Sequence, residues 1–423
     1  MRTTLPRNPY PGLRPFREDE QYLYFGREAA VDAMVDRLCS RRFLAVLGSS
    51  GSGKSSLINC GLRPALHRGL MAEAGSAWRI AVCRPGADPF AALARALDLR
   101  GVLFDMPAAA APSAALPRAA LIETTLRMSG LGLIDIVEQA RLREGVNVLV
   151  IVDQFEELFR YRGLTAGGRA EDDAAAFVDL LLNARSQSAL SIYVAISMRS
   201  DFLGDCTLYP GLAQTINESQ YLVPRMTRDE RRAAILGPIG VSGGEINPAL
   251  LTRLVNDVGD DLDQLSILQH ALNRTWSYWQ RETGGTGEIE LRHYEAIGTL
   301  AHALDQHAEE RWSCLAGDRD REVCMRLFKA LTDQVTDPRG VRRPAQLSAL
   351  CAVIHAEPEE VRSVIEIFRD PSCSFLVPPV PEPLGSETVI DVSHESLMRV
   401  WARLRTWLMD EARSEERRVG KEC

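Results

Sequence analysis

The sequence predicts an α/β fold in which a parallel sheet is followed by a helical arm and a winged-helix module. Three observations lead to this prediction. Apolar runs that end in turn residues alternate with helical patterns up to about residue 225, as is typical of a parallel sheet. A glycine-rich loop lies between the first run and a helical pattern. After Met226 the pattern changes to helices, with one β-rich segment near the C-terminus.

The sheet is predicted from five apolar runs that we interpret as buried strands. In chain order these runs are FLAVLG, WRIAVC, NVLVIV, LSIYVAISMR and YLVPRM. The Ala/Pro-rich stretch of residues 105–121 is expected to be a loop or an inserted helical hairpin inside the same unit. We therefore predict a lead-in over residues 1–25 and a first domain over residues 26–225.

The helical arm is predicted over residues 226–310 from capping signals and one apolar stripe. Thr227 and Glu230 have the spacing of a capping box, and we expect the helix that they open to stop at Gly237-Pro238. Asn247-Pro248 opens a second helix. Six apolar residues at spacings of three and four then mark the core-facing side of a long helix: Leu262, Leu265, Leu268, Leu272, Trp276 and Trp279.

Residues 311–412 are predicted to form the winged-helix module. Two helical patterns come first, followed by SFLVPPVPEPLGSETVIDV, which can form a hairpin, and by the helix SHESLMRVWARLRTWL. The last eleven residues, RSEERRVGKEC, form a charge-rich run. We interpret residues 413–423 as a non-native tail from adapter read-through, with a solvated native tail as the alternative. On the first interpretation, the natural chain continues beyond about Arg413.

Composition argues against several classes of function. The nine cysteines are scattered, without C-x-x-C or a neighbouring histidine at metal-ligand spacing, so we expect buried or inert thiols and not a zinc site. A net charge of −8 argues against a chain that wraps nucleic acid. No apolar stretch is long enough to span a bilayer, and the N-terminus has no hydrophobic signal segment. We expect a cytoplasmic protein without membrane contact.

The segment GSSGSGKS, residues 48–55, is the strongest functional signal. It matches the phosphate-binding pattern G-x-x-x-x-G-K-[ST] at every fixed position, between a predicted strand and a helix. Small residues let backbone N–H groups face phosphates, and the helix directs its positive end at them. The ammonium group of Lys54 would bind the β- and γ-phosphates, and the hydroxyl of Ser55 would bind Mg²⁺. The predicted nucleotide-binding residues of this segment are Gly48, Ser49, Ser50, Gly51, Ser52, Gly53, Lys54, Ser55 and Ser56.

Lysine is rare in this chain, which adds weight to Lys54. Only three of the 49 basic residues are lysines, namely Lys54, Lys329 and Lys421. The planar guanidinium of arginine could not enter a tight phosphate loop in the same way as an ammonium group. This requirement explains why a lysine persists at residue 54.

Three acids follow the third apolar run. Asp153 ends VLVIV and is the predicted water-mediated ligand of Mg²⁺, with a helix N-cap as the alternative. Glu156 and Glu157 lie one turn onward, and we rank Glu157 before Glu156 as the general base. Gln154 can orient a water but cannot take its proton, which points to slow hydrolysis.

Arg199 is a further catalytic candidate, because it follows another buried strand in ISMRSDF. Its guanidinium could sense the γ-phosphate. The alternative is a surface arginine paired with Asp201 or Asp205.

With these residues in place, the chain resembles the novel STAND type of P-loop NTPases, a branch of the ASCE class that is commonly found ahead of WD-repeat propellers in bacteria. The resemblance covers about residues 8–410. It rests on NPYPGLRPF, FGRE, GSSGSGKSS, DQFEELF, MRSDF, ILGPI and SHESL.

The resemblance implies further nucleotide contacts outside the glycine loop. Phe25, Gly26 and Arg27 would border the adenine or ribose, and Pro238 would lie against the base. In the related apoptotic and plant-immune NTPases, a winged-helix histidine touches the β-phosphate of ADP, and by analogy His394 would do so here. The alternative for His394 is a helix-capping or core histidine.

The leading hypothesis is an ATP/ADP-dependent switch with Mg²⁺ as its ion, held closed by ADP and opened by exchange for ATP. ATP is preferred because the N-K-x-D element that reads guanine does not occur. We expect self-association, a protein signalling partner and a sensor, such as a WD-repeat propeller, beyond this chain. One alternative is an AAA-like cycling ATPase, which would place a glutamate where Gln154 stands. The other is a winged-helix DNA-binding regulator modulated by ATP.

Overall fold

The computed structural model describes residues 7–105, 117–160, 169–187, 190–259, 264–333 and 341–410. The chain divides into two compact units. We call residues 16–225 the sheet unit, and residues 1–15 together with 226–423 the helical unit. The predicted tail of residues 413–423 and most of the Ala/Pro-rich stretch, residues 106–116, lie outside the described residues.

The sheet unit is built on a five-stranded parallel sheet with the order β2-β3-β4-β1-β5. Its strands are β1 (Phe43–Gly48), β2 (Trp78–Cys83), β3 (Asn147–Val152), β4 (Ile192–Arg199) and β5 (Gln220–Leu222). Every residue of β1, β3 and β4 is buried, because helices cover both faces of the sheet. The predicted α/β fold and its five strands are therefore confirmed.

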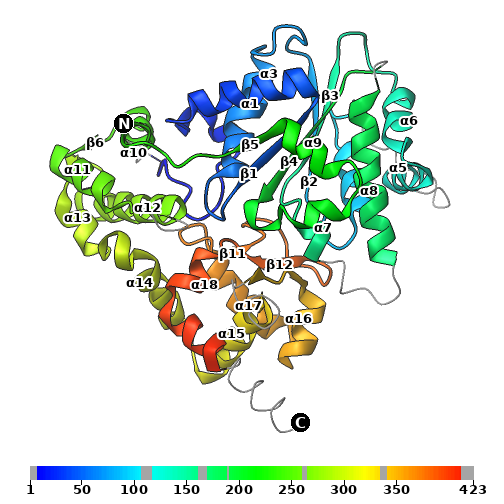
Figure 1. The fold of residues 1–423 in the computed structure, drawn as a ribbon. Helices are drawn as coiled ribbons and strands as arrows, with labels where there is room; N and C mark the ends of the chain where they lie inside the picture. Colours follow the sequence, from blue (N-terminus) through cyan, green and yellow to red (C-terminus); the bar gives the residue numbers. More distant parts are fainter. Residues whose placement is uncertain are drawn as a thin grey trace. The chain divides into compact units, whose positions relative to one another are not determined.

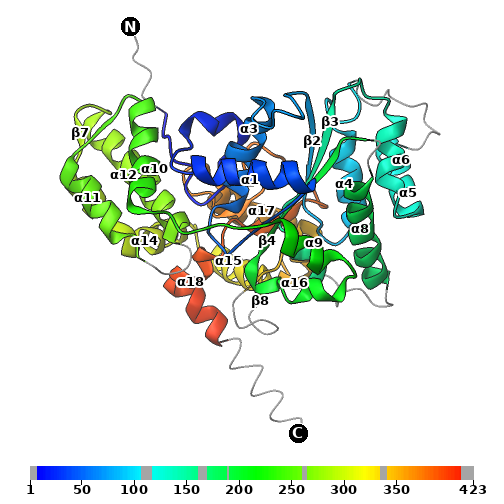
Figure 2. The ribbon, with the colours of Figure 1, turned by 45° about the horizontal axis from the view of Figure 1, so that its top comes forward.

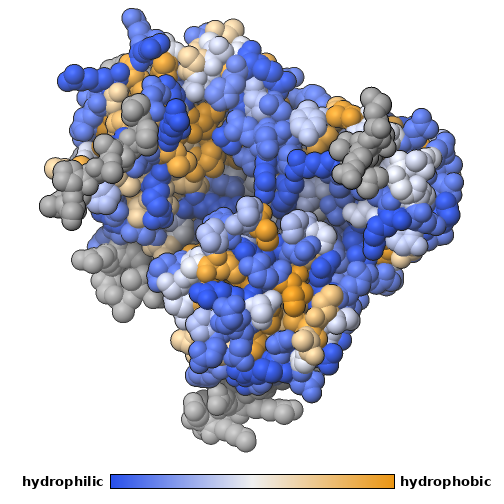
Figure 3. All heavy atoms as spheres, turned by 180° about the vertical axis from the view of Figure 1, so that it is seen from behind, coloured by the Kyte–Doolittle hydropathy of each residue, from blue (hydrophilic) through white to orange (hydrophobic). Residues whose placement is uncertain are grey.

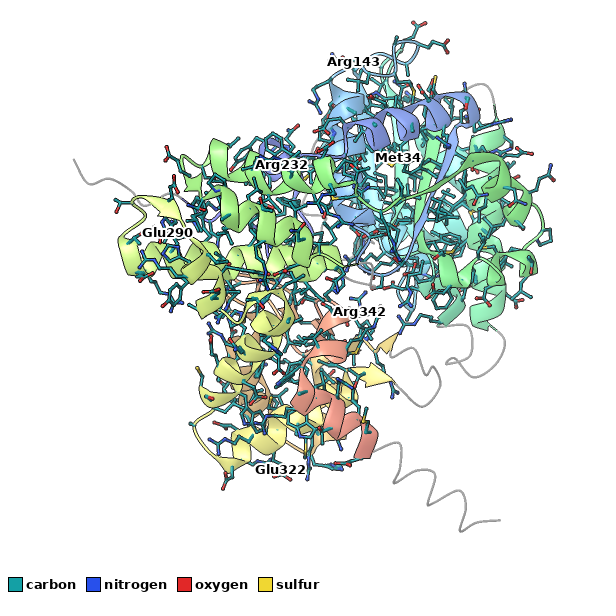
Figure 4. The ribbon with its side chains drawn as sticks, turned by 60° about the vertical axis from the view of Figure 1, so that its left-hand side comes forward. Met34, Arg143, Arg232, Glu290, Glu322 and Arg342 are labelled. Carbon is teal, nitrogen blue, oxygen red and sulfur yellow. The ribbon has the colours of Figure 1, made fainter. Side chains whose placement is uncertain are left out.

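Helices pack on the two faces of the sheet (Figure 1). On one face lie α1 (Glu28–Arg41), α2 (Lys54–Ser56), the π-helix η2 (Leu57–Leu62) and α3 (Arg63–His67), the last three being continuous. Met34 of α1 is completely buried there (Figure 4). On the other face lie α4 (Pro89–Asp98), α5 (Arg118–Met128), α6 (Gly132–Gln139), α8 (Arg169–Ser186) and α9 (Leu212–Ser219). Figure 2 shows α4, α5, α6 and α8 grouped together.

Short helical turns complete the sheet unit. They are η1 (Glu18–Leu23), α7 (Glu157–Arg160), η4 (Ser200–Phe202) and η5 (Asp205–Leu208). The α7 and η4 turns directly follow the ends of β3 and β4, where the polar residues of the site lie.

The first part of the helical unit contains α10 to α14 and two short strands. The bounds are α10 (Arg228–Val241), α11 (Pro248–Asp257), α12 (Gln264–Thr283), α13 (Leu291–Ala296), α14 (Thr299–Ser313), β6 (Glu245–Ile246) and β7 (Glu288–Ile289). The capping box of Thr227 and Glu230 forms as predicted. The predicted stop at Gly237-Pro238 is wrong, because Pro238 lies inside α10, which continues to Val241. Pro238 removes the hydrogen bond to the carbonyl of Ala234, and the packing of Ile235 and Ile239 in the core outweighs this cost.

The apolar stripe of α12 forms the core of this part of the chain. Leu268, Leu272, Trp276 and Trp279 are buried, and the rings of the two tryptophans lie 5.0 Å apart. This confirms the prediction for these four positions, whereas Leu262 lies outside the described residues.

The second part of the helical unit combines four helices, α15 to α18, with a small antiparallel sheet. Its main elements are α15 (Asp318–Ala330), β10 (Ala345–Gln346), α16 (Leu347–Ile354), α17 (Pro358–Arg369), β11 (Leu376–Val377), β12 (Val389–Val392) and α18 (Ser396–Val400). The predicted hairpin forms from β11 and β12, and β10 pairs with the free side of β12. The predicted single helix from SHESL onward is interrupted at Trp401 and resumes over residues 402–410.

A second, two-stranded ladder joins β8 (Thr332–Asp333) to β9 (Val341–Arg342). Arg342, labelled in Figure 4, donates from Nη1 to Asp391 Oδ2 of β12 at 2.7 Å.

The helix α14 spans residue 310, so the proposed boundary between arm and winged helix falls inside one helix.

The N-terminal segment NPYPGL belongs to the helical unit. Asn8 Nδ2 donates to the backbone oxygen of Asn273 at 2.9 Å, and the Tyr10 hydroxyl donates to Ile235 O at 2.6 Å. Leu13 is buried in the same core as α15 and α17. This part of the lead-in thus fastens elements that are distant in sequence.

The cysteines agree only in part with the expectation of buried or inert thiols. The eight cysteines among the described residues are free, and burial raises the pKa of Cys60, Cys83 and Cys206 to about 12. Cys314, next to the end of α14, is exposed.

The face shown in Figure 3 is largely polar, with apolar side chains in separate orange patches between blue regions. Within the described residues, no helix combines the length and the apolar character needed to cross a membrane.

Two buried histidines predict a pH-dependent stability. His270 of α12 and His307 of α14 have rings 5.2 Å apart, and burial lowers the pKa of His270 from 6.5 to about 3. Below about pH 6.5 the imidazole of His270 is protonated in the unfolded chain but stays neutral in the folded chain. We therefore expect the free energy of unfolding to fall by up to about 1.4 kcal/mol per pH unit between about pH 6.5 and 4 for this group.

Urea unfolding at several pH values measures this effect. Comparison with the His270→Gln variant isolates the histidine from the carboxylates that also titrate in acid. Equal slopes for the parent and the variant would contradict the prediction.

Candidate functional site

The glycine loop of residues 48–55 connects β1 to α2 with a strained backbone that glycine permits. Gly51 and Gly53 have φ values of +71° and +86°, a left-handed region that other residues enter at a cost. A Cβ added to Gly48 would lie 2.7 Å from Ser52 Oγ, so the start of the loop is also closely packed. The loop therefore has the compact form that brings backbone N–H groups to a phosphate.

Lys54 begins α2 and folds back over this loop. Its Nζ donates to Gly48 O at 2.9 Å and to Ser49 O at 2.8 Å. The ammonium group thus lies on the loop that the sequence predicts to hold phosphate, and its charge suits the β- and γ-phosphates.

Ser55 and Asp153 meet at the ends of α2 and β3. Ser55 Oγ lies 3.0 Å from both carboxylate oxygens of Asp153, and only 8% of Asp153 is exposed. The structure thus brings together the two residues that the sequence assigned to Mg²⁺. Hydroxyl and carboxylate oxygens are ligands that Mg²⁺ prefers, so this pair fits the ion.

Ser197 of β4 is a part of the site that sequence reasoning missed. Its hydroxyl donates to Asp153 Oδ1 and accepts from the N–H of Gln154 at 3.2 Å. Gln154 adopts a left-handed φ of +57°, and the N–H of Phe155 then donates to Ser197 O at 2.8 Å. β4 therefore fixes both the carboxylate of Asp153 and the turn that follows it. Nothing in the sequence shows which residue of β4 lies beside Asp153.

The two glutamates behind Asp153 have different partners. Glu156 Oε2 accepts from the backbone N–H of Arg199 at 3.3 Å, whereas Glu157 Oε2 accepts from that of Gly86 at 2.9 Å. Burial raises the pKa of Glu156, while the nearby Lys54 ammonium acts in the opposite direction. The carboxylate of Glu156 therefore feels the charge of Lys54, whereas Glu157 holds the loop after β2.

Arg199 ends β4, is buried and forms an ion pair with Asp201. Its Nη2 lies 2.5 Å from Asp201 Oδ2, and its guanidinium lies 5.9 Å from the ring centre of Phe202. The pairing with Asp201 that the sequence left open is thus present, and sensing of the γ-phosphate stays a prediction.

Arg84 is a second residue that was not selected from the sequence. It directly follows β2, and its Nε lies 3.6 Å from Asp153 Oδ2. Its side chain is 48% exposed. The signal in the sequence was its position behind an apolar run, which is the same signal that selected Asp153 and Arg199.

The residues predicted to border the nucleotide base lie at the start of α1. Gly26 has a φ of +82° and its N–H donates to Glu28 Oε1 at 3.1 Å, while Arg27 Nη1 donates to Pro224 O at 2.8 Å. Arg27 is 4% exposed, so its charge is directed at the backbone behind β5. Contact of Phe25, Gly26 and Arg27 with a base or ribose stays a prediction.

Ser56 ends the predicted phosphate segment. Its hydroxyl accepts from the N–H of Phe16 at 3.1 Å, so it fastens the N-terminal segment to the helix behind the loop. Its N–H group, at the first turn of the helix, is the part that suits a phosphate.

Pro238 and His394 belong to the helical unit, and their contact with nucleotide stays a prediction. Pro238 is buried in α10. His394 Nδ1 accepts from the N–H of Ser396 at 3.1 Å, and its Nε2 lies 2.9 Å from Ser266 Oγ of α12. The helix-capping role that the sequence left open is therefore present. Since Nδ1 is an acceptor, neutral His394 carries its proton on Nε2, towards Ser266.

Several solved structures are similar to this chain. The ORC2 protein of Aeropyrum pernix, in ADPNP–ADP complexes, has a TM-score of 0.49 and 13% identity, over 97% of each chain. A Walker-type ATPase of Pyrococcus abyssi has a TM-score of 0.42 and 13% identity, over 92% of this chain and 98% of its own. Cdc6p of Pyrobaculum aerophilum has a TM-score of 0.39 and 13% identity, over 91% and 94%.

No curated protein matches the sequence. A family model described as Novel STAND NTPase 1 matches residues 9–420, which is nearly the whole chain and extends into the segment interpreted above as a tail. The glycine loop with Lys54, the Ser55–Asp153 pair and the parallel sheet that carries them agree with a P-loop NTPase. The chain therefore belongs to the novel STAND NTPase 1 family.

Proposed function

We propose that this protein is a cytoplasmic molecular switch that binds ATP and ADP with Mg²⁺ and hydrolyses ATP slowly. The observation that carries this proposal is the residue after the Mg²⁺ ligand. Gln154 stands there, held in a left-handed turn, and a glutamine cannot take a proton from the attacking water. A site with Lys54, Ser55 and Asp153 but without an acid at residue 154 favours holding a nucleotide over rapid cycling. The same observation argues against an AAA-like cycling ATPase.

We assign the role of general base to Glu156 ahead of Glu157. Burial raises the pKa of Glu156, which makes its carboxylate a stronger base than an exposed glutamate. The hydrogen bond from Gly86 to Glu157 supports a different task for the second acid, that of holding the loop after β2. The order predicted from the sequence is therefore reversed in this proposal.

The proposed switch has an ADP-bound closed state, which exchange for ATP opens. Arm and winged helix would close over the nucleotide, with Pro238 at the base and His394 at the β-phosphate. To reach a phosphate, His394 Nε2 would have to leave Ser266 Oγ. The family resemblance also supports self-association on opening, a WD-repeat sensor and a protein partner that receives the signal.

The element order of the second helical part supports the winged-helix assignment, since α15, β10, α16, α17, β11 and β12 follow one another as helices with a small wing. In such modules the helix before the wing reads DNA. That helix is α17, and its Arg362 and Arg369 pair with Glu359 and Glu366 of the same helix. An acidic, internally paired helix does not suit a phosphate backbone, so the DNA-binding alternative is not favoured.

Nucleotide content and single-turnover hydrolysis test this proposal. We expect the purified protein to retain ADP in nearly stoichiometric amount. We also expect it to cleave bound ATP with a rate constant on the order of 10⁻⁴ to 10⁻² s⁻¹, as switch NTPases do without an activator. The Lys54→Ala variant, purified in parallel, should retain no ADP. Rapid multiple turnover by a monomer would overturn the switch, and a salt-dependent mobility shift of DNA would favour the regulator instead.

A further inference from the structure

We propose that Arg84 contacts the γ-phosphate of bound ATP and adds to the affinity for ATP a contribution that ADP cannot receive. The inference rests on the proposed function, namely that the site binds adenine nucleotides with Mg²⁺. It adds a recognition residue that neither the motifs nor the family resemblance singled out.

The backbone places Arg84 beside the predicted Mg²⁺ ligand. Cys83 of β2 pairs with Val152 of β3, and the N–H of Asp153 donates to Cys83 O at 2.9 Å. Arg84 and Asp153 are thus the first residues beyond the carboxyl ends of two neighbouring parallel strands. In open α/β sheets, ligands bind at that edge.

The side chain of Arg84 is available to a ligand. Its only polar contact within the described residues is the one between Nε and Asp153 Oδ2, at 3.6 Å. Nearly half of the side chain is exposed, against 11% of the Asp153 side chain. The two terminal nitrogens can therefore form the paired N–H bonds with which a guanidinium binds phosphate oxygens.

Arg199 is the competing residue for this role, and its contacts argue against it. Its side chain is only 8% exposed, and Nη2 lies 2.5 Å from Asp201 Oδ2. To reach a phosphate it would have to give up a short, buried ion pair, which is costly. Arg84 would give up only a longer contact at a half-exposed position.

The loop that carries Arg84 is held at two points. The N–H of Gly86 donates to Glu157 Oε2 at 2.9 Å, and Asp88 Oδ1 caps α4 by accepting from Ala91 at 2.9 Å. The first of these anchors comes from the segment that begins with Asp153. An arginine on an anchored loop loses less conformational entropy on binding than one on a free loop.

Calorimetric titration of protein freed of bound nucleotide, with Mg²⁺ and either ADP or a non-hydrolysable ATP analogue, tests the proposal. For Arg84→Gln we expect the affinity for the ATP analogue to fall about 10- to 100-fold, as for loss of a charge-assisted pair, with ADP affinity unchanged within about twofold. Arg84→Lys should give an intermediate value, since it keeps the charge but not the fork. The matched control is Arg79→Gln, which removes a β2 arginine paired with the exposed Asp105.

The outcomes separate this inference from the proposed function. If the parent protein binds neither nucleotide, both the proposed function and the role of Arg84 are overturned. If the parent binds both and Arg84→Gln either changes nothing or weakens ATP and ADP equally, only the role of Arg84 is overturned. A loss of affinity for the ATP analogue alone in Arg199→Gln, with Arg84→Gln unchanged, would assign the γ-phosphate to Arg199 instead.

Discussion

Replacement of Asp153 by alanine is expected to remove Mg²⁺-dependent nucleotide binding, with a loss of affinity of about 100-fold or more. Asp153 lies 3.0 Å from Ser55 Oγ and is itself held by Ser197, so its loss removes one of two predicted oxygen ligands and leaves the other without support. Ser197→Ala should weaken Mg²⁺ binding by a smaller factor of about 10-fold, since it leaves the carboxylate in place but less well oriented. Ser197→Thr, which keeps the hydroxyl, should restore most of the affinity.

Titration of ATP with Mg²⁺ and with a chelator measures both variants. Asp179→Ala, at an exposed position of α8, is the matched control for the loss of an acid and should behave as the parent. If Asp153→Ala binds the Mg²⁺ complex as tightly as the parent protein, Asp153 is not the ligand, and the site must be reassigned.

Replacement of Glu156 by glutamine is expected to slow ATP cleavage about 10²- to 10⁴-fold, while ATP remains bound. The amide still accepts the hydrogen bond from the N–H of Arg199 but cannot take a proton. Glu157→Gln should have a much smaller effect, because its amide oxygen still accepts from Gly86 and the loop keeps its anchor. The two variants differ from the parent by the same exchange of oxygen for nitrogen, so each is a control for the other.

Single-turnover cleavage of prebound ATP separates the two acids from effects on binding. A larger loss for Glu157→Gln than for Glu156→Gln would restore the order predicted from the sequence. Parental rates in both variants would mean that neither acid is the base, and that an activating partner supplies it.

The sheet and the centre of the site could be predicted from the sequence because both leave local patterns. A strand with helices on both faces is a continuous apolar run, and each of the five runs became a strand. The first polar residue after such a run lies at the ligand-binding edge, which is how Asp153 was selected. The glycine loop could be predicted because all of its residues lie in one continuous segment of the sequence.

The remainder of the site depends on contacts across strands, which no local pattern reveals. Ser197 looked like one more small residue in a buried strand until the pairing of β3 with β4 brought it to Asp153. The different partners of Glu156 and Glu157 come from the ends of β4 and β2, so their spacing in sequence could not rank them. The prediction that Pro238 ends its helix was wrong for a related reason. The packing of α10 against its neighbours stabilises the helix by more than the lost hydrogen bond costs.

The exposed thiol of Cys314 can carry a dye for optical measurement. Maleimides react with thiolates, and the raised pKa values of Cys60, Cys83 and Cys206 leave these buried thiols inert at neutral pH. Among the cysteines that the structure describes, Cys314 is the exposed one, and it lies in the helical unit. In a variant with Cys39, Cys351 and Cys423 replaced by serine, a single dye at Cys314 would report on that unit when nucleotide is added, so the proposed opening could be followed in real time.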